Sequence, residues 1–94
     1  MWARLARFEN EPQNIDGAIE RIRGLSDAGD LPTALAGARV MMLVDRQSGG
    51  MIGLTLFDTE DALRTGDAAM NAGPGNAGRR SSVEFYEVAM DLAL

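Results

Sequence analysis

The chain has neither cysteine nor histidine among its 94 residues. Without cysteine, it can form no disulfide and has no thiol nucleophile. Without histidine, it lacks the side chain that titrates near neutral pH and the commonest protein ligand for zinc and haem iron. Ser-His-Asp and Cys-His nucleophile systems are therefore excluded.

Lysine is also missing, so all nine basic residues are arginine, against fourteen acidic residues and a net charge of −5. A nucleic-acid-binding surface needs a basic stripe, and the only adjacent pair, Arg79 and Arg80, lies in a predicted loop. Arginines interrupt the apolar segment 1–8, and no window approaches the ~18 apolar residues of a membrane span. We therefore expect a cytoplasmic protein with no nucleic-acid or membrane partner.

The length and composition indicate a single globular domain over residues 1–94. The chain is 46% hydrophobic and 24% charged, which is typical of a folded soluble protein. A domain this small buries only about two-thirds of the surface that its unfolded chain exposes. Oligomerisation would therefore add stability.

The residue pattern predicts six elements in the order strand, helix, strand, strand, helix, strand. The first helix rests on an apolar stripe at helical spacing, and the middle strands flank turn residues at 45–50. The predicted elements are a strand over 2–8, a helix from Pro12 to a stop at Gly24, strands over 40–44 and 51–57, a helix capped by Asp58 and ending at 71–73, and a strand over 83–90. The pattern of residues 25–37 predicts a connection with a helical turn near 33–36, and the pattern of 73–81 predicts a loop.

This βαββαβ order predicts an α+β, ferredoxin-like fold, a four-stranded antiparallel sheet with both helices on one face. The two middle strands are apolar on both faces, although the helices cover only one. We therefore expect a homodimer in which two sheets pack face to face as a dimeric α+β barrel, with Leu54 facing the partner.

The sequence resembles the antibiotic biosynthesis monooxygenase-like proteins, which are small dimeric α+β barrels. The resemblance spans nearly the whole chain and is more specific for the fold than for an activity. It rests on residues 2–4 and 7–9, 14–19, 44–50, 54–63 and 84–88. The family includes cofactor-independent oxygenases of aromatic polyketides and oxygen-dependent haem-degrading enzymes. The resemblance thus implies oxygenase chemistry with no metal or flavin cofactor.

Three positions depart from the haem-degrading members of that family. Those members carry an asparagine, a tryptophan and an iron-ligating histidine where this sequence has Ala6, Phe57 and Asp67. Loss of the imidazole removes the iron ligand, so haem degradation is not expected. Phe57 also lacks the indole donor that ends this strand in the polyketide oxygenases.

Two residues are weak catalytic candidates. By the family alignment Arg4 faces the helices, where its guanidinium can anchor an enolate or carboxylate, with a strand-end arginine paired with a surface acid as the alternative. Tyr86 offers a hydroxyl, with aromatic packing on the strand as the alternative. Trp2, Phe8 and Phe57 are candidate walls of a substrate cavity, or simply core residues.

The remaining motifs favour structural explanations. The acids Glu60 and Asp61 suit the positive first turn of a helix. Glu84 and Glu87 fall on opposite faces of a strand, so the sequence predicts no metal site. The glycines at 73, 75 and 78 spell the dinucleotide-binding spacing, but they leave a helix and enter a strand, the reverse of that motif.

Two functions follow from these residues. The first is a cofactor-independent monooxygenase acting on an aromatic or polyketide-type molecule, which rests on the resemblance. The second is a non-catalytic homodimer that binds a small apolar metabolite or serves structurally.

Overall fold

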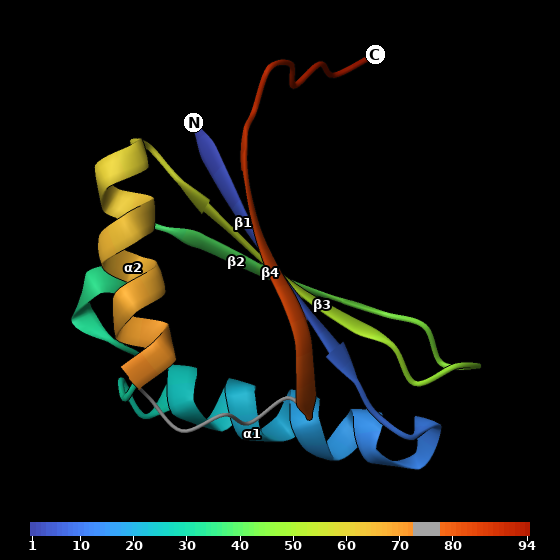
Figure 1. Cartoon of the computed structure of the whole chain (residues 1–94). Helices are drawn as coiled ribbons and strands as arrows, with labels where there is room; N and C mark the ends of the chain where they lie inside the picture. Colours follow the sequence, from blue (N-terminus) through green and yellow to red (C-terminus); the bar gives the residue numbers. More distant parts are fainter. Residues whose placement is uncertain (73–77) are drawn as a thin grey trace.

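The structure is a computed structural model that describes residues 1–72 and 78–94. It contains a four-stranded antiparallel sheet and two α-helices (Figure 1). In chain order, the elements are β1 (Trp2–Glu9), the short helical turn η1 (Pro12–Asn14), α1 (Ile15–Asp27), η2 (Thr33–Leu35), β2 (Arg39–Val44), β3 (Met51–Phe57), α2 (Glu60–Ala72) and β4 (Arg79–Glu87). The predicted α+β class and element order are confirmed.

The strands lie in the order β2-β3-β1-β4, so β1 and β3 occupy the middle of the sheet. Arg4 lies opposite Thr55 of β3 and Phe85 of β4. Because side chains alternate along a strand, this register divides the sheet into two faces. The inner face, on the helix side, carries Trp2, Arg4, Ala6, Phe8, Val40, Met42, Val44, Met51, Gly53, Thr55, Phe57, Val83 and Phe85. The outer face carries Ala3, Leu5, Arg7, Met41, Leu43, Ile52, Leu54, Leu56, Glu84 and Tyr86.

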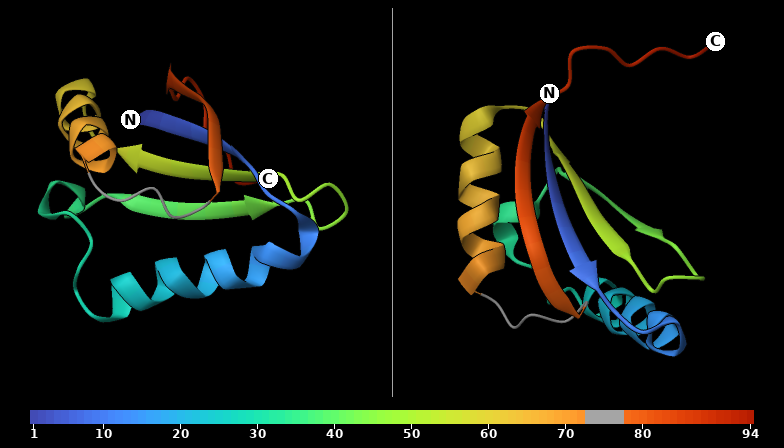
Figure 2. Two further views of the ribbon diagram at one scale, coloured as in Figure 1. Left: turned by 60° about the horizontal axis from the view of Figure 1, so that its bottom comes forward. Right: turned by 45° about the vertical axis from the view of Figure 1, so that its right-hand side comes forward.

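Both helices pack on the inner face, at different parts of the sheet. Ile15 and Ala18 of α1 are fully buried against Met51, near one end of the strands. α2 runs alongside β4, whereas α1 lies below the sheet in the view of Figure 1 (Figure 2). The space between the helices and the middle of the inner face is left for the cavity described below.

The helix boundaries correct two sequence predictions. α1 continues through Gly24 and stops at Gly29, which has φ +72°. The amide of Gly29 donates to Ser26 and that of Asp30 to Leu25, which is the hydrogen-bond pattern of a glycine stop. The second correction concerns α2, whose cap is Thr59 rather than Asp58. The Thr59 hydroxyl accepts from the Ala62 amide at 3.1 Å.

The final strand is also shifted from its prediction over 83–90. β4 begins at Arg79 because its first residues pair with the end of β1, and it ends at Glu87. A register shift opposite Arg7 and Phe8 places Arg80, rather than Ser81, across from Phe8. Such a bulge re-aims the side chains beyond it, and here it turns Arg80 to the inner face.

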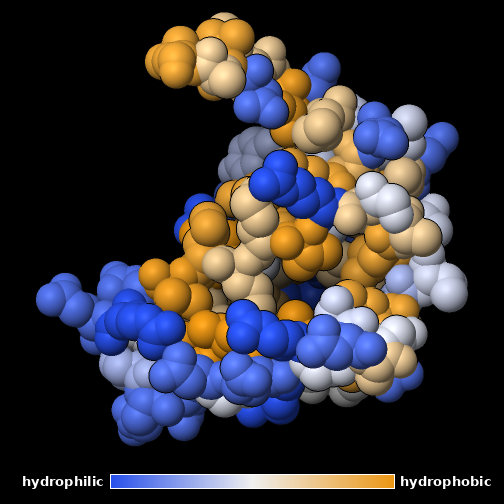
Figure 3. Space-filling view, turned by 180° about the vertical axis from the view of Figure 1, so that it is seen from behind, coloured by the Kyte–Doolittle hydropathy of each residue, from blue (hydrophilic) through white to orange (hydrophobic). Residues whose placement is uncertain are grey.

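After β4, the Val88 amide still donates to the Met1 carbonyl at 2.9 Å, and residues 89–94 project from the body of the molecule (Figures 1 and 2). Their apolar side chains are exposed, with Met90 at 74% and Leu92 at 68%. Viewed from behind, hydrophobic side chains gather over the hollowed middle of the surface, between this segment and a hydrophilic lower rim (Figure 3). The protein thus presents a large apolar surface.

Candidate functional site

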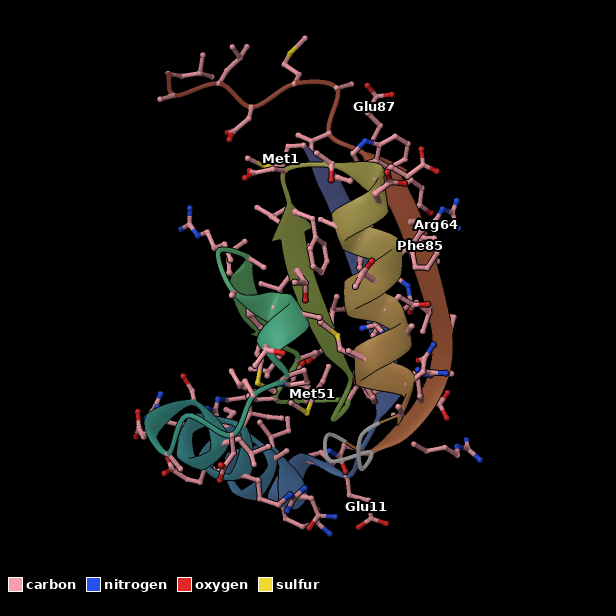
Figure 4. The ribbon with its side chains drawn as sticks, turned by 90° about the vertical axis from the view of Figure 1, so that its left-hand side faces the viewer. Met1, Glu11, Met51, Arg64, Phe85 and Glu87 are labelled. Atoms are coloured by element: carbon pink, nitrogen blue, oxygen red, sulfur yellow. The ribbon has the colours of Figure 1, made fainter. Side chains whose placement is uncertain are left out.

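A cavity of about 560 Å³ lies between the inner face and the helical segments. Its floor is the inner face of the sheet, with Met51 at the end nearer α1 (Figure 4). Its roof is formed by Ile22 and Leu25 of α1 and by the connection that follows. The lining residues are Arg4, Ala6, Phe8, Ile22, Leu25, Asp30, Leu31, Pro32, Leu35, Val40, Met42, Met51, Gly53, Thr55, Met70, Asn71, Gly78 and Arg80. Most of these are apolar, and the volume is within the usual range for a small-molecule site.

The sequence leaves this space open by placing small residues at the centre of the floor. Ala6 and Gly53 are cross-strand partners there, between the large side chains Phe8 and Met51 at one end and Arg4 and Thr55 towards the other. A β-carbon on Gly53 would make only ordinary contacts, 3.7 Å from the Phe8 ring. The cavity therefore owes its volume to the small methyl group of Ala6 and the missing side chain at Gly53.

Arg4 is a charged residue of the floor, and only 4% of it is exposed. Its Nε donates to Asp67 Oδ1 at 2.8 Å, which forms an ion pair between the central strand and α2. Its two terminal nitrogens have weaker partners. Nη1 lies 2.9 Å from the Met70 sulfur, and Nη2 lies 3.5 Å from Asn71 Oδ1. Because a thioether is a weak acceptor, this guanidinium retains donor capacity towards the cavity.

Asn71 joins a second arginine to this group. Arg80 Nη1 also donates to Asn71 Oδ1, and the Asn71 amide donates to Asp67 Oδ2 at 3.2 Å. Arg80 reaches this position because of the bulge in β4. Its sequence context predicted a solvated residue in a loop, and the side chain is exposed but lies in a strand. Arg4, Asp67, Asn71 and Arg80 thus form one connected network, which we call the arginine corner.

The structure brings only two of the five predicted site residues into the cavity lining. Arg4 and Phe8 line it. Phe57 is on the same face but is buried beneath α2, where its ring lies against Gly66. Trp2 is half-buried at the end of the inner face, outside the lining.

Tyr86 lies on the outer face, across the sheet from the cavity. Its hydroxyl donates to Glu84, whose other carboxylate oxygen accepts from Arg7 Nε at 2.7 Å. These two hydrogen bonds lower the pKa of Glu84, and the bond to the carboxylate raises the pKa of Tyr86. Arg4 and Tyr86 therefore do not form one catalytic site within a chain.

Reasoning from the sequence missed the helix side of the arginine corner. Asp67, Met70 and Asn71 lie at i, i+3 and i+4 on α2, a spacing that puts all three on one helix face. That spacing was a usable signal for a cluster facing the sheet. The part played by Arg80 had no comparable signal, because it depends on the bulge.

Metal ligation finds no support in the part of the chain that the structure describes. No group of three acidic residues there lies close enough to hold a metal ion. Among the same residues, no helix is both long and apolar enough to cross a membrane.

Near the start of α2, the Arg64 guanidinium lies over the Phe85 ring of β4, with its Cζ 5.5 Å from the ring centroid (Figure 4). This contact and the Arg4 ion pair both connect α2 to the sheet.

A scan of the sequence against models of protein families found no match, and a search among curated proteins found no significant similarity.

Proposed function

We propose that the protein binds a small, largely apolar molecule, of aromatic or similar shape, in the cavity between the sheet and the helices. The observation that carries this proposal is the combination of a cavity of about 560 Å³, a mostly apolar lining and one buried guanidinium. Ligand sites commonly have such composition, an apolar wall with a few polar groups that fix orientation.

We further propose that the fold is ferredoxin-like and that two chains pair through their outer faces to form a dimeric α+β barrel. The strand order and the two helices on one face support this fold. The outer face supports the dimer because its centre is apolar and no helix covers it in the described chain. It exposes 47% of Leu43 and 50% of Tyr86. A large exposed apolar patch commonly marks an interface.

A second candidate function is cofactor-independent monooxygenation of an electron-rich aromatic molecule. Arg4 favours it, because a buried cation stabilises the deprotonated substrate that reacts with O₂. In the net reaction, a CH₂ group between aromatic rings becomes a carbonyl, and the second oxygen atom leaves as water. Oxygen uptake with anthrones, dependent on Arg4 and independent of Tyr86, is the expected result.

The binding proposal is tested by filling the cavity. Replacing Gly53 with isoleucine places a branched side chain over the floor, in a strand that favours such residues. We expect native mass spectrometry to show a dimer at twice the 10.1 kDa chain mass that binds naphthoate, and the Gly53→Ile dimer to lose that binding.

The matched control is Gly24→Ala, where the added methyl group meets nothing within 4 Å. This variant should bind as the wild type does. A folded Gly53→Ile protein that binds naphthoate unchanged would place the ligand elsewhere and contradict the proposal.

A further inference from the structure

Two guanidinium groups meet on one neutral acceptor at the arginine corner. Arg4 Nη2 and Arg80 Nη1 both point to Asn71 Oδ1. They come from different strands, Arg4 from the centre of the sheet and Arg80 from the bulged start of β4. Like charges repel, so this convergence is favourable only if negative charge lies close by.

Asp67 supplies one negative charge against the two guanidinium groups, so one net positive charge remains at the arginine corner. Its Oδ1 accepts from Arg4 Nε, and its Oδ2 accepts from the Asn71 amide. Both of its oxygens are thus engaged on the α2 side of Arg4. The terminal nitrogens of Arg4 are left with a thioether and a distant amide oxygen.

A carboxylate would satisfy these nitrogens better than their present partners do. Hydrogen bonds from guanidinium to carboxylate are charge-assisted and about twice as strong as neutral ones, and the planar fork suits two oxygens. Burial of Arg4 strengthens the attraction further, because solvent screens it little. Asp30, an acid of the cavity lining, repels a second negative charge on the ligand.

From this geometry we infer that the ligand is a monoanion, an apolar ring system bearing one carboxylate or one equivalent acidic oxygen, with its charge held between Arg4 and Arg80. The inference rests on the proposed binding function and adds its chemical class. The apolar body occupies the space over Ala6 and Gly53, and the charged group displaces the Asn71 carbonyl from the two arginines.

Two probes of equal shape test the inference, naphthoate and its neutral analogue naphthamide, each titrated calorimetrically. For the wild type we expect naphthoate to bind at least about tenfold more tightly than naphthamide, as charge-assisted hydrogen bonds predict. Arg80→Gln, at an exposed position, should reduce that preference to about threefold or less, because naphthoate affinity falls more than naphthamide affinity. The matched control Arg23→Gln, on the exposed side of α1, should keep the full preference.

A second variant, Arg4→Lys, keeps the charge and loses the fork. It should lower naphthoate affinity by a larger factor than naphthamide affinity, because only the carboxylate uses both arms of the charged fork, with folding checked by circular dichroism. Equal binding of both probes to the wild type would overturn the anion inference and leave the binding function standing. Failure of both probes to bind would overturn the two together.

Discussion

Arg4 and Asp67 join the central strand of the sheet to helix α2 through an ion pair of 2.8 Å, with Arg4 almost wholly buried. The two residues are 63 positions apart in the sequence. A buried charge is strongly destabilising without a partner. The Arg4 guanidinium therefore favours the position of α2 that keeps Asp67 beside it.

Replacing Asp67 with alanine should lower the free energy of unfolding by about 3 kcal/mol, because it leaves the Arg4 guanidinium buried without its carboxylate. Urea denaturation measures the change. The control is Glu60→Ala, which breaks the exposed pair with Arg64 and should cost less than about 1 kcal/mol. Equal losses of unfolding free energy in the two variants would show that the buried pair stabilises the fold no more than the exposed pair does.

Gly66→Ala should destabilise the protein, although alanine is ordinarily the better helix residue. A β-carbon at Gly66 would lie 2.5 Å from Cζ of Phe57, so the ring or the helix must shift, at a cost of about 1–3 kcal/mol. At Gly24, where the space is open, the same substitution should stabilise by up to about 1 kcal/mol. Thermal unfolding of both variants gives opposite signs if this packing is correct.

Tyr86 should titrate above the ordinary pKa of tyrosine, because its hydroxyl donates to Glu84. The chain has a single tyrosine, so tyrosinate absorbance reports this residue alone. Glu84→Gln removes the negative charge and should lower the pKa of Tyr86. Glu87→Gln is the control, since Glu87 lies on the inner side of β4, and it should leave the Tyr86 pKa unchanged.

The same contact sets a pH dependence of stability. The pKa of Glu84 is lower in the folded protein, so its stabilising contribution is present above the unfolded pKa and is lost as the pH falls through the folded value. The stability difference between wild type and Glu84→Gln should therefore shrink in acid. A difference that stays constant across that range would disprove the linkage.

Leu54→Asp should dissociate the proposed dimer, because it buries an unpaired carboxylate at the centre of the outer face. Sedimentation velocity distinguishes monomer from dimer. Thr65→Asp adds the same charge on the exposed side of α2 and should leave the dimer intact. A folded, dimeric Leu54→Asp protein would remove the outer face from the interface.

The sequence predicted the elements well where local signals decide them. The β3 bounds and the short turn near 33–36 agree with the structure, because apolar runs and turn residues specify both locally. The stop at Gly24 was wrong because glycine inside an exposed helix costs only about 1 kcal/mol. The true stop at Gly29 depends on a left-handed conformation that composition alone does not reveal.

The candidate site was predicted only in part. Strand alternation put Arg4 and Phe8 on one face, the family resemblance turned that face towards the helices, and both residues line the cavity. The sequence left Phe57 open between cavity wall and core residue, because the outcome depends on how closely α2 approaches. It did not fix the sheet face of Tyr86, which depends on the pairing register of β4. Arg80 required a bulge, and a bulge reflects the pairing of two strands distant in sequence rather than the residues of one.

The floor and the roof of the cavity are held by different backbone hydrogen bonds, and this difference bears on how the proposed ligand enters and leaves. The floor strands β1 and β3 each have hydrogen-bonded neighbours on both sides, so their amides should be among the slowest to exchange with solvent. The backbone hydrogen bonds found across residues 28–38 are all local, reaching no further than the end of α1. Opening of these residues would separate no strand, so we expect the proposed ligand to enter and leave while the sheet stays intact.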